Sequence, residues 1–572
     1  MDQTDRLSPA PDAIDRRPAD VTRRSFLAAT LSGGAALVGG GLSVLGHPSL
    51  ASATTHAPWI EKSIPELQAL MASRRLTSRQ LTQGYLQRIA DLNPLLHAVI
   101  ETNPQAIAIA ARLDAERRAG HVRGALHGIP ILVKDNIATD DTMQTTAGSL
   151  ALVGSRVPHD APLVARLRAA GAVILGKANL SEWANFRGAP PWDFNGWSAR
   201  GGKTRDPYQL GFDPCGSSSG SAAAAAANLC AAAVGTETDG SIVCPATNNL
   251  VFGLKPTLGL ISQNGIIPIA HSQDTAGPMA RSVVDIAILL SVMQTPFGEV
   301  AGHHVPRDYT RFLDRRSLQG KTIGVDQRYL APPYDFPVNP LTLEAFQVGL
   351  DALESLGATL VPCDTGDIFA YGGDEFTVLI DEFKVDIARY LAGLRRTRMR
   401  TLSDLIAFNN AHCAEEMPYY GQEVFELAEA TSGDLTDPAY LAARANCLLQ
   451  SRTLGIDAAL ATGVDAIVAP SYTLASQPAA VAGYPNMAIP CGFAADGRPA
   501  GMWMYAGFLQ EPKLLAFAYA LEQAITPRTA PRYLGTLQPF PPNPGICAAL
   551  SPTSAMADRA THFRAGRPTA HR

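Results

Sequence analysis

The sequence predicts an α/β fold: a single α/β/α domain around a large, mixed and twisted β-sheet, with additional N-terminal helices on its flank. Two observations support this prediction. From Gly128 onward, short apolar runs alternate with stretches of helical periodicity, a pattern typical of a sheet that helices cover on both faces. The chain also has 572 residues, of which 46% are apolar and 17% are charged, so it can bury a large core.

Three helices are expected in the flanking region, residues 63–120. Ser63 and Glu66 form a capping-box pattern at the start of the first helix. Thr77 and Gln80 repeat that pattern, and the apolar residues that follow keep helical spacing. A third helical run completes the region, and all three are expected to serve packing.

Six apolar runs are expected to form strands, and a helix is expected near Ala161 to Ala170. The expected strands are Ile129 to Val133, Ala172 to Leu175, Lys321 to Val325, Thr359 to Val361, Ala466 to Val468 and Arg498 to Tyr505. We assign residues 54–535 to the one domain. In residues 536–572, Pro, Ala, Ser, Arg and Thr dominate, which predicts a disordered tail.

The first 53 residues have the composition of a targeting segment. The pair Arg23-Arg24 precedes a Gly-rich apolar stretch from Phe26 to about Gly46, and Ala51-Ser52-Ala53 is a small-residue cleavage pattern. The segment resembles a twin-arginine export signal, which implies the twin-arginine export machinery as a partner and a periplasmic or secreted mature protein. The alternative is a retained membrane anchor, because about 20 apolar residues can span a bilayer. The glycines weaken the hydrophobicity, so we expect a cleaved signal and no stable anchor.

Charge and cysteine content narrow the choice of partners. The net charge of -5 is small for this length, and no long basic run lies outside the amino terminus, so nucleic acid is not an expected partner. A small neutral or modestly polar molecule is the expected ligand. The eight cysteines lack any C-x-x-C pair, so the sequence predicts neither a zinc site nor a dense disulfide framework. Their redox state and the oligomeric state stay open.

The first chemically informative segment is Gly128–Asn136, an apolar run that ends in Lys134. Burial of an ammonium group is costly and lowers its pKa, and a neutral amine is a competent general base. The alternative is a structural lysine that emerges at the strand end and pairs with Asp135. This segment by itself favours neither interpretation.

The second segment, Cys215–Ser221, leads directly into the alanine run Ala222–Ala227. Gly216, Ser217, Ser218 and Gly220 supply a tight loop with hydroxyls and exposed amides, and alanine is a strong helix former. A Ser/Gly linker is one alternative. Another is the G-x-S-x-G elbow of α/β-hydrolases, but that motif needs a preceding strand and a later acid and histidine, and the sequence offers no convincing setting for them.

The third segment, Gly235–Ala246, contains a glycine followed by a serine at its centre. Gly240 permits a turn that aims successive backbone N–H groups at one point, as stabilisation of an oxyanion requires, and Ser241 lies at that point. The alternative is an ordinary polar turn between two elements.

Together the three segments resemble the amidase-signature family, whose motifs are a G-x-P-x-x-x-K-D strand end, a G-S-S-x-G-S loop and a D-x-G-S-I-type turn. The resemblance runs from about Trp59 to Tyr533. It is strongest to bacterial peptide amidases, because long matches occur at Ser181–Gly188, Gly196–Gly202 and Ser272–Ser282. It implies the amidase-signature fold.

The resemblance also implies a mechanism. In it Ser241 attacks the carbonyl, Ser217 relays the proton to neutral Lys134, and a cis peptide bond precedes Ser217. The expected reaction is hydrolysis of a primary carboxamide, in particular a peptide C-terminal amide, to carboxylate and ammonia. No metal or organic cofactor is expected.

By the same resemblance, the backbone N–H groups of Thr238, Asp239, Gly240 and Ser241 form the oxyanion hole. Many family members have glycine at the position of Asp239, and an acidic side chain there disfavours substrates with a free carboxylate near the scissile group. The stretch Ser471–Ala479 is shorter than the corresponding region of peptide amidases, which helps to shape their cleft.

Three other functions are alternatives. An amidase for small aryl or aliphatic amides would keep the chemistry and change the substrate. A non-catalytic periplasmic binding protein would keep only the cleft, and the intact Lys134, Ser217 and Ser241 argue against it. A subunit that supplies ammonia for transfer-RNA amidation is disfavoured by the export signal and by the absence of a basic face.

Overall fold

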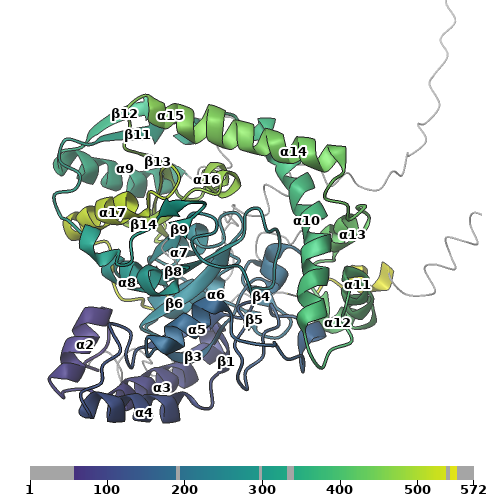
Figure 1. Ribbon diagram of the computed structural model, residues 1–572, viewed down its shortest axis with the longest axis horizontal. Coiled ribbons are helices and arrows are strands. Elements are labelled where there is room, and N and C mark those ends of the chain that lie inside the picture. Colours follow the sequence, from purple (N-terminus) through teal and green to yellow (C-terminus); the bar gives the residue numbers. More distant parts are fainter. Residues whose placement is uncertain (1–56, 189–193, 296–298, 331–339, 536–540, 550–572) are drawn as a thin grey trace, which may run out of the picture.

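A computed structural model gives the fold of the chain (Figure 1). It describes residues 57–188, 194–295, 299–330, 340–535 and 541–549. The predicted export signal and most of the predicted tail lie outside these ranges.

One mixed sheet of 11 strands runs through the protein. In order across the sheet, the strands are β1 (Val99–Thr102), β3 (Val173–Ala178), β2 (Pro130–Lys134), β6 (Ala232–Glu237), β8 (Thr275–Ala280), β7 (Phe252–Lys255), β14 (Asn486–Phe493), β15 (Pro499–Tyr505), β13 (Ala466–Pro470), β11 (Thr322–Asp326) and β12 (Thr359–Cys363). β2 is parallel to β3 and β6, and β11 is parallel to β12 and β13. The central strands between these groups pair antiparallel.

Two short hairpins accompany the sheet: β4 (Trp197–Ser198) with β5 (Gly202–Lys203), and β9 (Glu299–Val300) with β10 (His303–His304). The helices of the first half are α2 (Ile64–Ala72), α3 (Ser78–Leu96), α4 (Ala106–Arg118), α5 (Pro162–Ala169), α6 (Ser219–Ala226), α7 (Val243–Asn248) and α8 (Val283–Met293). Those of the second half are α9 (Pro340–Ser355), α10 (Gly372–Gly393), α11 (Leu402–Ala411), α12 (Cys413–Glu416), α13 (Glu423–Glu429), α14 (Pro438–Leu448), α15 (Asp457–Ala461), α16 (Gln477–Ala482), α17 (Glu511–Ile525) and α18 (Pro544–Ala549).

Helices cover both faces of the sheet because successive side chains of each strand point to opposite sides. On β15, Met502 and Met504 join a core cluster that includes the apolar face of α17, whereas Trp503 and Tyr505 join a second cluster that includes residues of α7 and α16. The α/β fold predicted from the sequence is confirmed. Figure 1 also shows α2 to α4 beneath one end of the sheet and α10 to α13 as a separate layer beside it.

The predicted helix starts are confirmed at both capping boxes. Ser63 and Thr77 are the N-caps of α2 and α3. The Ser63 N–H donates to the Glu66 carboxylate, and Thr77 exchanges hydrogen bonds with Gln80. Apolar residues of both helices are buried, as expected for elements that serve packing. Among the described helices, none combines the length and the apolar character needed to cross a membrane.

The predicted tail differs in one part from the expectation of disorder. Residues 541–549 include α18, and the Cys413–Cys547 disulfide attaches this segment to α12. A covalent link can order a short segment whose composition would not fold alone, and the sequence did not indicate this pairing. The remainder of residues 536–572 lies outside the described residues.

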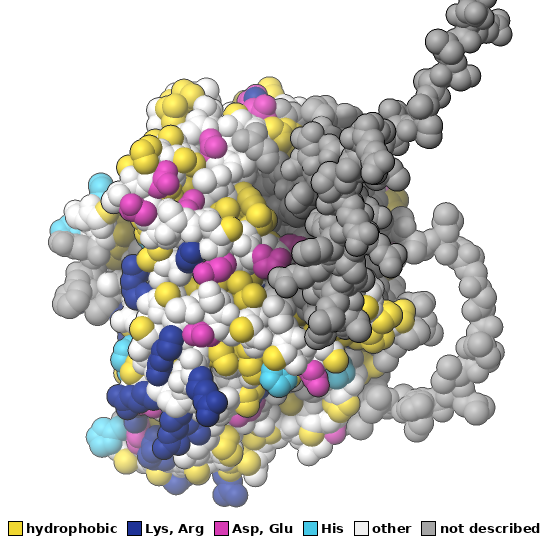
Figure 2. Space-filling model, turned by 90° about the vertical axis from the view of Figure 1, so that its right-hand side faces the viewer, with side chains coloured by type: hydrophobic (Ala, Val, Ile, Leu, Met, Phe, Trp, Pro, Cys, Tyr) yellow, Lys and Arg dark blue, Asp and Glu magenta, His cyan; other side chains and the backbone are white. Residues whose placement is uncertain are grey.

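Charged side chains are unevenly distributed on the face shown in Figure 2, which is the right-hand side of Figure 1. Most Lys and Arg side chains gather at the lower left of this face, whereas Asp and Glu side chains are spread mainly over its middle and upper parts. The positive charge on this face is therefore concentrated locally, although the net charge of the chain is -5.

Candidate active site

The three segments singled out in the sequence meet at one edge of the sheet. Lys134 is the last residue of β2, and the turn Thr238–Ser241 directly follows β6. β2 and β6 are parallel neighbours, so their carboxyl ends lie at the same edge. The loop before α6 reaches the same place because α6 packs against both strands. In open α/β sheets, this edge is where ligands bind.

The side chain of Lys134 is fully buried and surrounded by hydroxyl and carbonyl oxygens. Its Nζ lies 2.8 Å from Ser217 Oγ, 3.0 Å from Ser218 Oγ, 2.9 Å from Thr236 Oγ1 and 3.2 Å from the Thr236 carbonyl oxygen. An ammonium group has three N–H donors and no acceptor. A neutral amine has two N–H donors and one lone pair, so it can accept a proton from one of the hydroxyls that contact it.

The same environment sets the protonation of Lys134. Burial lowers the pKa of Lys134 from 10.5 to about 7, and the nearby carboxylates of Asp274 and Glu237 oppose this effect. A lysine with an ordinary pKa would be almost entirely protonated at neutral pH, whereas the lowered pKa of Lys134 makes the neutral amine accessible there.

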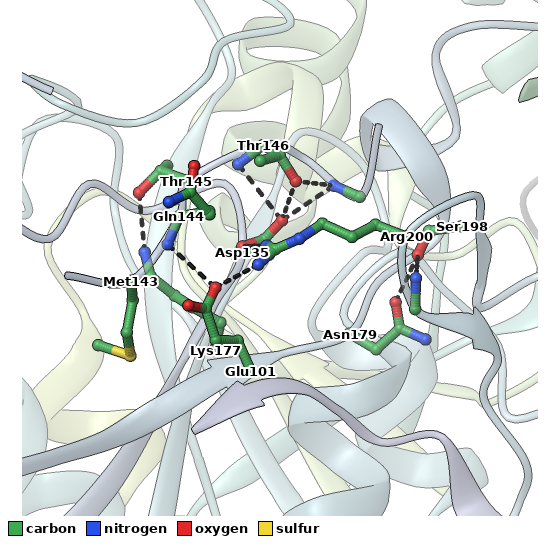
Figure 3. Close-up of polar contacts among 12 residues, drawn as sticks. Glu101, Asp135, Met143, Gln144, Thr145, Thr146, Lys177, Asn179, Ser198 and Arg200 are labelled. Carbon is green, nitrogen blue, oxygen red and sulfur yellow. Dashed lines mark hydrogen bonds and ion pairs between the residues drawn. The ribbon is translucent and has the colours of Figure 1, made fainter. Parts of the chain in front are cut away.

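The alternative in which Lys134 pairs with Asp135 is wrong. Asp135 accepts hydrogen bonds from the Thr146 hydroxyl at 2.5 Å and the Gly148 N–H at 3.0 Å, and forms an ion pair with Arg200 at 3.2 Å (Figure 3). None of these partners contacts Lys134, so Asp135 fixes the end of β2 while the preceding residue, Lys134, points at the serines.

A second buried lysine, Lys177 on β3, lies beside this network (Figure 3). Burial lowers its pKa to about 8, against the opposing charge of Asp135. Its Nζ donates to the Ile137 carbonyl at 2.5 Å and to the Thr145 hydroxyl at 2.9 Å. Because no serine is among these partners, we assign a structural role to Lys177 and regard Lys134 as the candidate base.

The loop that carries Ser217 is held tightly. The peptide bond between Gly216 and Ser217 is cis, as the resemblance implied. A Cβ added to Gly220 would lie 2.4 to 2.5 Å from backbone atoms of Ala98 and Asn179, so only glycine fits there. Ser218 contacts Lys134 and the backbone of Thr236, and no histidine, which removes the basis for the G-x-S-x-G elbow.

The turn before α7 presents Ser241 together with several backbone N–H groups. Gly240 has φ of +73°, a left-handed conformation that favours glycine. The buried Glu237 carboxylate accepts hydrogen bonds from the N–H groups of Ile242 at 2.7 Å and Val243 at 3.0 Å, and thereby fixes the start of α7. Ser241 is thus held at the junction of the turn and the helix.

The four predicted oxyanion-hole N–H groups are not equivalent. Within the described part of the chain, the N–H groups of Thr238, Asp239 and Ser241 have no hydrogen-bond partner. The N–H of Gly240 instead faces the Glu237 carboxylate. Three of the four groups are therefore available to a ligand oxygen.

The two serines are connected through the backbone. The N–H of Ser218 donates to the Ser241 carbonyl oxygen at 3.2 Å. The Ser241 hydroxyl has no hydrogen-bond partner among the described residues, and it makes none with Ser217. The structure thus brings Lys134 and Ser217 into direct contact and leaves the Ser241 hydroxyl unengaged. Catalytic hydrogen bonds are often long without a substrate and shorten only when one binds.

Two acidic side chains lie close to this turn. Asp239 accepts a hydrogen bond from the Ser476 hydroxyl at 2.7 Å, and burial followed by the charge of Glu375 raises the pKa of Asp239 well above its usual value. Glu375 accepts from Gln273 at 2.9 Å and from Gln477, and burial raises its pKa to about 7. Ser476 and Gln477 lie within the stretch Ser471–Ala479, so this stretch helps to build the site.

Sequence reasoning missed the roles of Thr236, Glu237 and Asp274. All three lie in segments that the resemblance quoted, but nothing in their spacing showed that Thr236 contacts Lys134. Asp274 accepts hydrogen bonds from the Thr238 hydroxyl at 2.6 Å and from the N–H of Ile269 at 2.7 Å. Asp274 therefore connects the turn to the segment around Ile269.

One cluster of possible metal ligands was also found among the described residues: His271, Glu382 and Asp386. Its oxygens already have partners. His271 Nδ1 lies 2.8 Å from Asp386, Tyr440 donates to Glu382 at 2.8 Å, and Arg389 donates to Asp386 at 2.6 Å. We therefore assign no metal to this cluster.

Comparisons with known proteins agree with the geometry. A family model described as Amidase matches residues 80–477. A probable amidase from Arabidopsis thaliana is 40% identical over 83% of this chain and 92% of that protein. A putative amidase from Schizosaccharomyces pombe is 37% identical over 83% of this chain and 87% of that protein. A glutamyl-tRNA(Gln) amidotransferase component from Thermosynechococcus vestitus is 34% identical over 80% of this chain and 97% of its own length.

Solved structures give the same result. The structure of peptide amidase from Stenotrophomonas maltophilia is 48% identical in sequence, covers 83% of this chain and 99% of its own, and matches with a TM-score of 0.77. The resemblance detected in the sequence is confirmed. The chain belongs to the amidase-signature family and is an amidase, a hydrolase that acts on amide bonds.

Proposed function

We propose that this amidase hydrolyses primary carboxamides, in particular the C-terminal amides of peptides, to a carboxylate and ammonia, with Lys134, Ser217 and Ser241 as its catalytic set. The observation that carries the proposal is the buried Lys134 amine, 2.8 Å from the Ser217 hydroxyl and with a pKa of about 7. A base with a pKa near the working pH is the most effective general base.

In the proposed mechanism, Ser241 Oγ attacks the amide carbon while its proton passes through the Ser217 hydroxyl to neutral Lys134. The tetrahedral oxyanion is stabilised by backbone N–H groups of the turn Thr238–Ser241. Lys134 returns the proton through Ser217 to the leaving nitrogen, so that ammonia departs and an acyl group remains on Ser241. Water then cleaves this ester by the same proton route, which releases the carboxylate and restores Ser241.

Two features favour peptide amides as substrates. Above about pH 7, where Glu375 is ionised, its carboxylate near the turn disfavours a ligand with a free carboxylate, and a peptide amide has none at its C-terminus. The peptide amidase of Stenotrophomonas maltophilia, at 48% identity, supports the same class. Small aryl or aliphatic amides are the second candidate, because they need the same chemistry and a smaller cleft.

The proposal is tested by ammonia release from C-terminally amidated peptides, free amino-acid amides, aryl amides and glutamine. We expect release from the amidated peptides, and its loss in Ser241→Ala. Ser451→Ala is a matched control, because Ser451 is also buried but only donates to the Cys447 carbonyl at 2.7 Å. Release only from small amides would change the substrate class. Release only from glutamine would favour an ammonia-supplying role, and no release would revive the binding-protein alternative.

We also propose that residues 1–53 direct the protein to the twin-arginine export machinery, so that the mature protein is periplasmic or secreted. The support is the arginine pair ahead of a Gly-rich apolar stretch and a small-residue cleavage pattern. In a fusion of residues 1–53 to a reporter that folds before export, the change of Arg23 and Arg24 to Lys should abolish export. The same change at Arg16 and Arg17, a second arginine pair, is the control. Export that survives the first change would contradict the proposal.

A further inference from the structure

A disulfide connects the two segments that carry the candidate serines. Cys215 lies two residues before Ser217, and Cys244 lies three residues after Ser241. The two cysteines are bonded to each other, with their Cα atoms 5.9 Å apart. Both side chains are buried, with 2% and 1% exposed. The covalent link therefore spans from the loop before α6 to the first turn of α7.

The other direct contacts between these parts of the chain are hydrogen bonds. Next to the serines, the Ser218 N–H donates to the Ser241 carbonyl oxygen at 3.2 Å, and the Ser218 hydroxyl donates to the Thr236 carbonyl oxygen at 3.0 Å. Near the end of α7, Asn248 donates to the Asp213 carbonyl at 3.2 Å and Asn249 donates to the Pro214 carbonyl at 2.9 Å. Each such hydrogen bond contributes only about 1 kcal/mol net. The disulfide is the covalent connection among these contacts.

The position of one serine relative to the other depends on these backbone contacts. The two hydroxyls make no hydrogen bond with each other, so nothing at the level of their side chains fixes the distance between Ser217 and Ser241. Proton transfer between them needs a separation of about 2.6 to 3.2 Å in the reacting complex. A misplacement of ~1 Å at a reacting centre can cost about 100-fold in rate.

We propose that the Cys215–Cys244 disulfide is a positioning element of the catalytic pair, so that full amidase activity requires this bond. The proposal rests on the assignment of Ser217 and Ser241 to catalysis. Two separate thiols need more room than bonded sulfurs, and both cysteines belong to a closely packed core cluster. Reduction of the bond therefore displaces the loop of Ser217 against the helix that follows Ser241, and replacement of both cysteines by alanine leaves only hydrogen bonds and packing to hold the two segments together.

Formation of the bond removes two electrons and two protons from the thiols, and the disulfide of a thiol–disulfide exchange partner is the oxidant that becomes a dithiol. Because both sulfurs are buried, a reductant reaches them only after local opening. The bond is thus expected to be a stable structural disulfide, as is typical of proteins in an oxidising compartment.

The second disulfide offers a matched control. Cys413 and Cys547 join α12 to α18, and neither α12 nor α18 includes a residue of the candidate site. The double change Cys413→Ala and Cys547→Ala thus removes a disulfide and two sulfur atoms without touching the catalytic segments.

The experiment measures kcat and KM for an amidated peptide in wild type, in Cys215→Ala/Cys244→Ala and in the control pair, each checked by circular dichroism. We expect kcat of the first variant to fall about 10- to 100-fold with KM changed less than about threefold, while the control keeps wild-type kcat. The single change Cys215→Ala should match the double change, because the bond and not either residue is required.

Peptide mapping of the active wild type without reductant provides a readout that does not depend on the folding of any variant. We expect Cys215 and Cys244 in one cross-linked peptide. Free thiols at these positions in fully active enzyme would overturn the proposal, as would wild-type kcat in Cys215→Ala/Cys244→Ala. If the cross-linked wild type hydrolyses no amide, the proposed function fails instead, and the two failures are distinguishable.

Discussion

Among single side chains, the proposed base Lys134 is expected to determine how activity depends on pH. Its pKa of about 7 means that the amine is protonated, and inactive as a base, below that pH. We therefore expect kcat/KM for an uncharged amide to rise as the pH increases through about 7 and to level off above it, since kcat/KM reports the ionisation of the free enzyme. A profile from about pH 5 to 9 checks this. Full activity retained at about pH 5 would rule out a lysine base.

Asp274 offers a way to shift that profile. Its carboxylate raises the pKa of Lys134, so Asp274→Asn should move the inflection of kcat/KM to lower pH. Burial raises the pKa of Asp274 itself to about 7, so its charge is present mainly above that pH. Asp285→Asn is the control, because Asp285 is also buried but receives its hydrogen bond from the Ile64 N–H, far along the chain from the site. A shift to higher pH, or an equal shift in the control, would contradict the assignment.

The residue roles were only partly predictable. Lys134, Ser217 and Ser241 could be proposed from the sequence because each lies in a motif that includes glycine at a fixed offset, and the structure brings Lys134 and Ser217 into contact. Thr236 and Asp274 could not be identified in this way, because their contacts with Lys134 and the turn are made across the sheet, between segments far apart in the sequence. The disulfide between Cys215 and Cys244 could not be predicted for the same reason, because the two cysteines meet only in the folded structure.

At the level of elements, a buried ion pair stabilises the segment beside the site. Arg187 lies 2.9 Å from Glu182, both side chains are fully buried, and Arg187 also donates to the backbone of Glu416 and Tyr420. This cluster joins the loop after β3 to the region of α12. Burial and the nearby Glu416 raise the pKa of Glu182 well above its usual value, while Arg187 opposes this.

Removal of the arginine should therefore be costly. We expect Arg187→Met to lower the free energy of unfolding by about 3 to 5 kcal/mol, because the buried Glu182 carboxyl group and the backbone carbonyls of Glu416 and Tyr420 lose the group that hydrogen-bonds to them. Urea denaturation measures this loss. Arg389→Met is the control, because Arg389 is 67% exposed and its pair with Asp386 should contribute ~1 kcal/mol or less. Equal losses would refute this account.

Strands were predictable where apolar residues are continuous. All six predicted strands are confirmed, with boundaries that differ by only a few residues. The other five strands of the large sheet, β1, β6, β7, β8 and β14, were not predicted. Of these, β8 contains Gly277 and Pro278, and β14 contains Pro490 and Gly492. Both residue types have low strand propensity. These strands form because neighbouring strands and helices bury them, which is a tertiary effect.

At the scale of the whole molecule, the Cys413–Cys547 disulfide attaches the C-terminal segment to the domain across 134 residues of sequence. α18 has only six residues, and a helix of that length is not stable alone. We expect Cys413→Ala/Cys547→Ala to make residues 541–549 sensitive to limited proteolysis, with kcat unchanged. Mass spectrometry of the fragments checks this, and unchanged resistance would show that other contacts hold the segment.

The global architecture was more predictable than the local chemistry. Alternation of apolar runs and helices indicated a sheet with two covered faces. On β15, Met502 and Met504 are buried on one face of the sheet, and Trp503 and Tyr505 are buried on the other. The order of the strands could not be predicted, because the crossovers that bring β6 beside β2 leave no local pattern. That order is what places Lys134 and Ser241 at one edge.

We propose that Lys134 and Ser241 act as one catalytic unit, and a double-mutant cycle tests this most directly. We would measure kcat/KM for an amidated peptide in wild type, Lys134→Ala, Ser241→Ala and the double variant. Each single change should lower kcat/KM by orders of magnitude, and the double variant should be no slower than the slower single variant, because groups that act together are strongly non-additive. Losses that multiply in the double variant, or substantial activity in Ser241→Ala, would contradict the account.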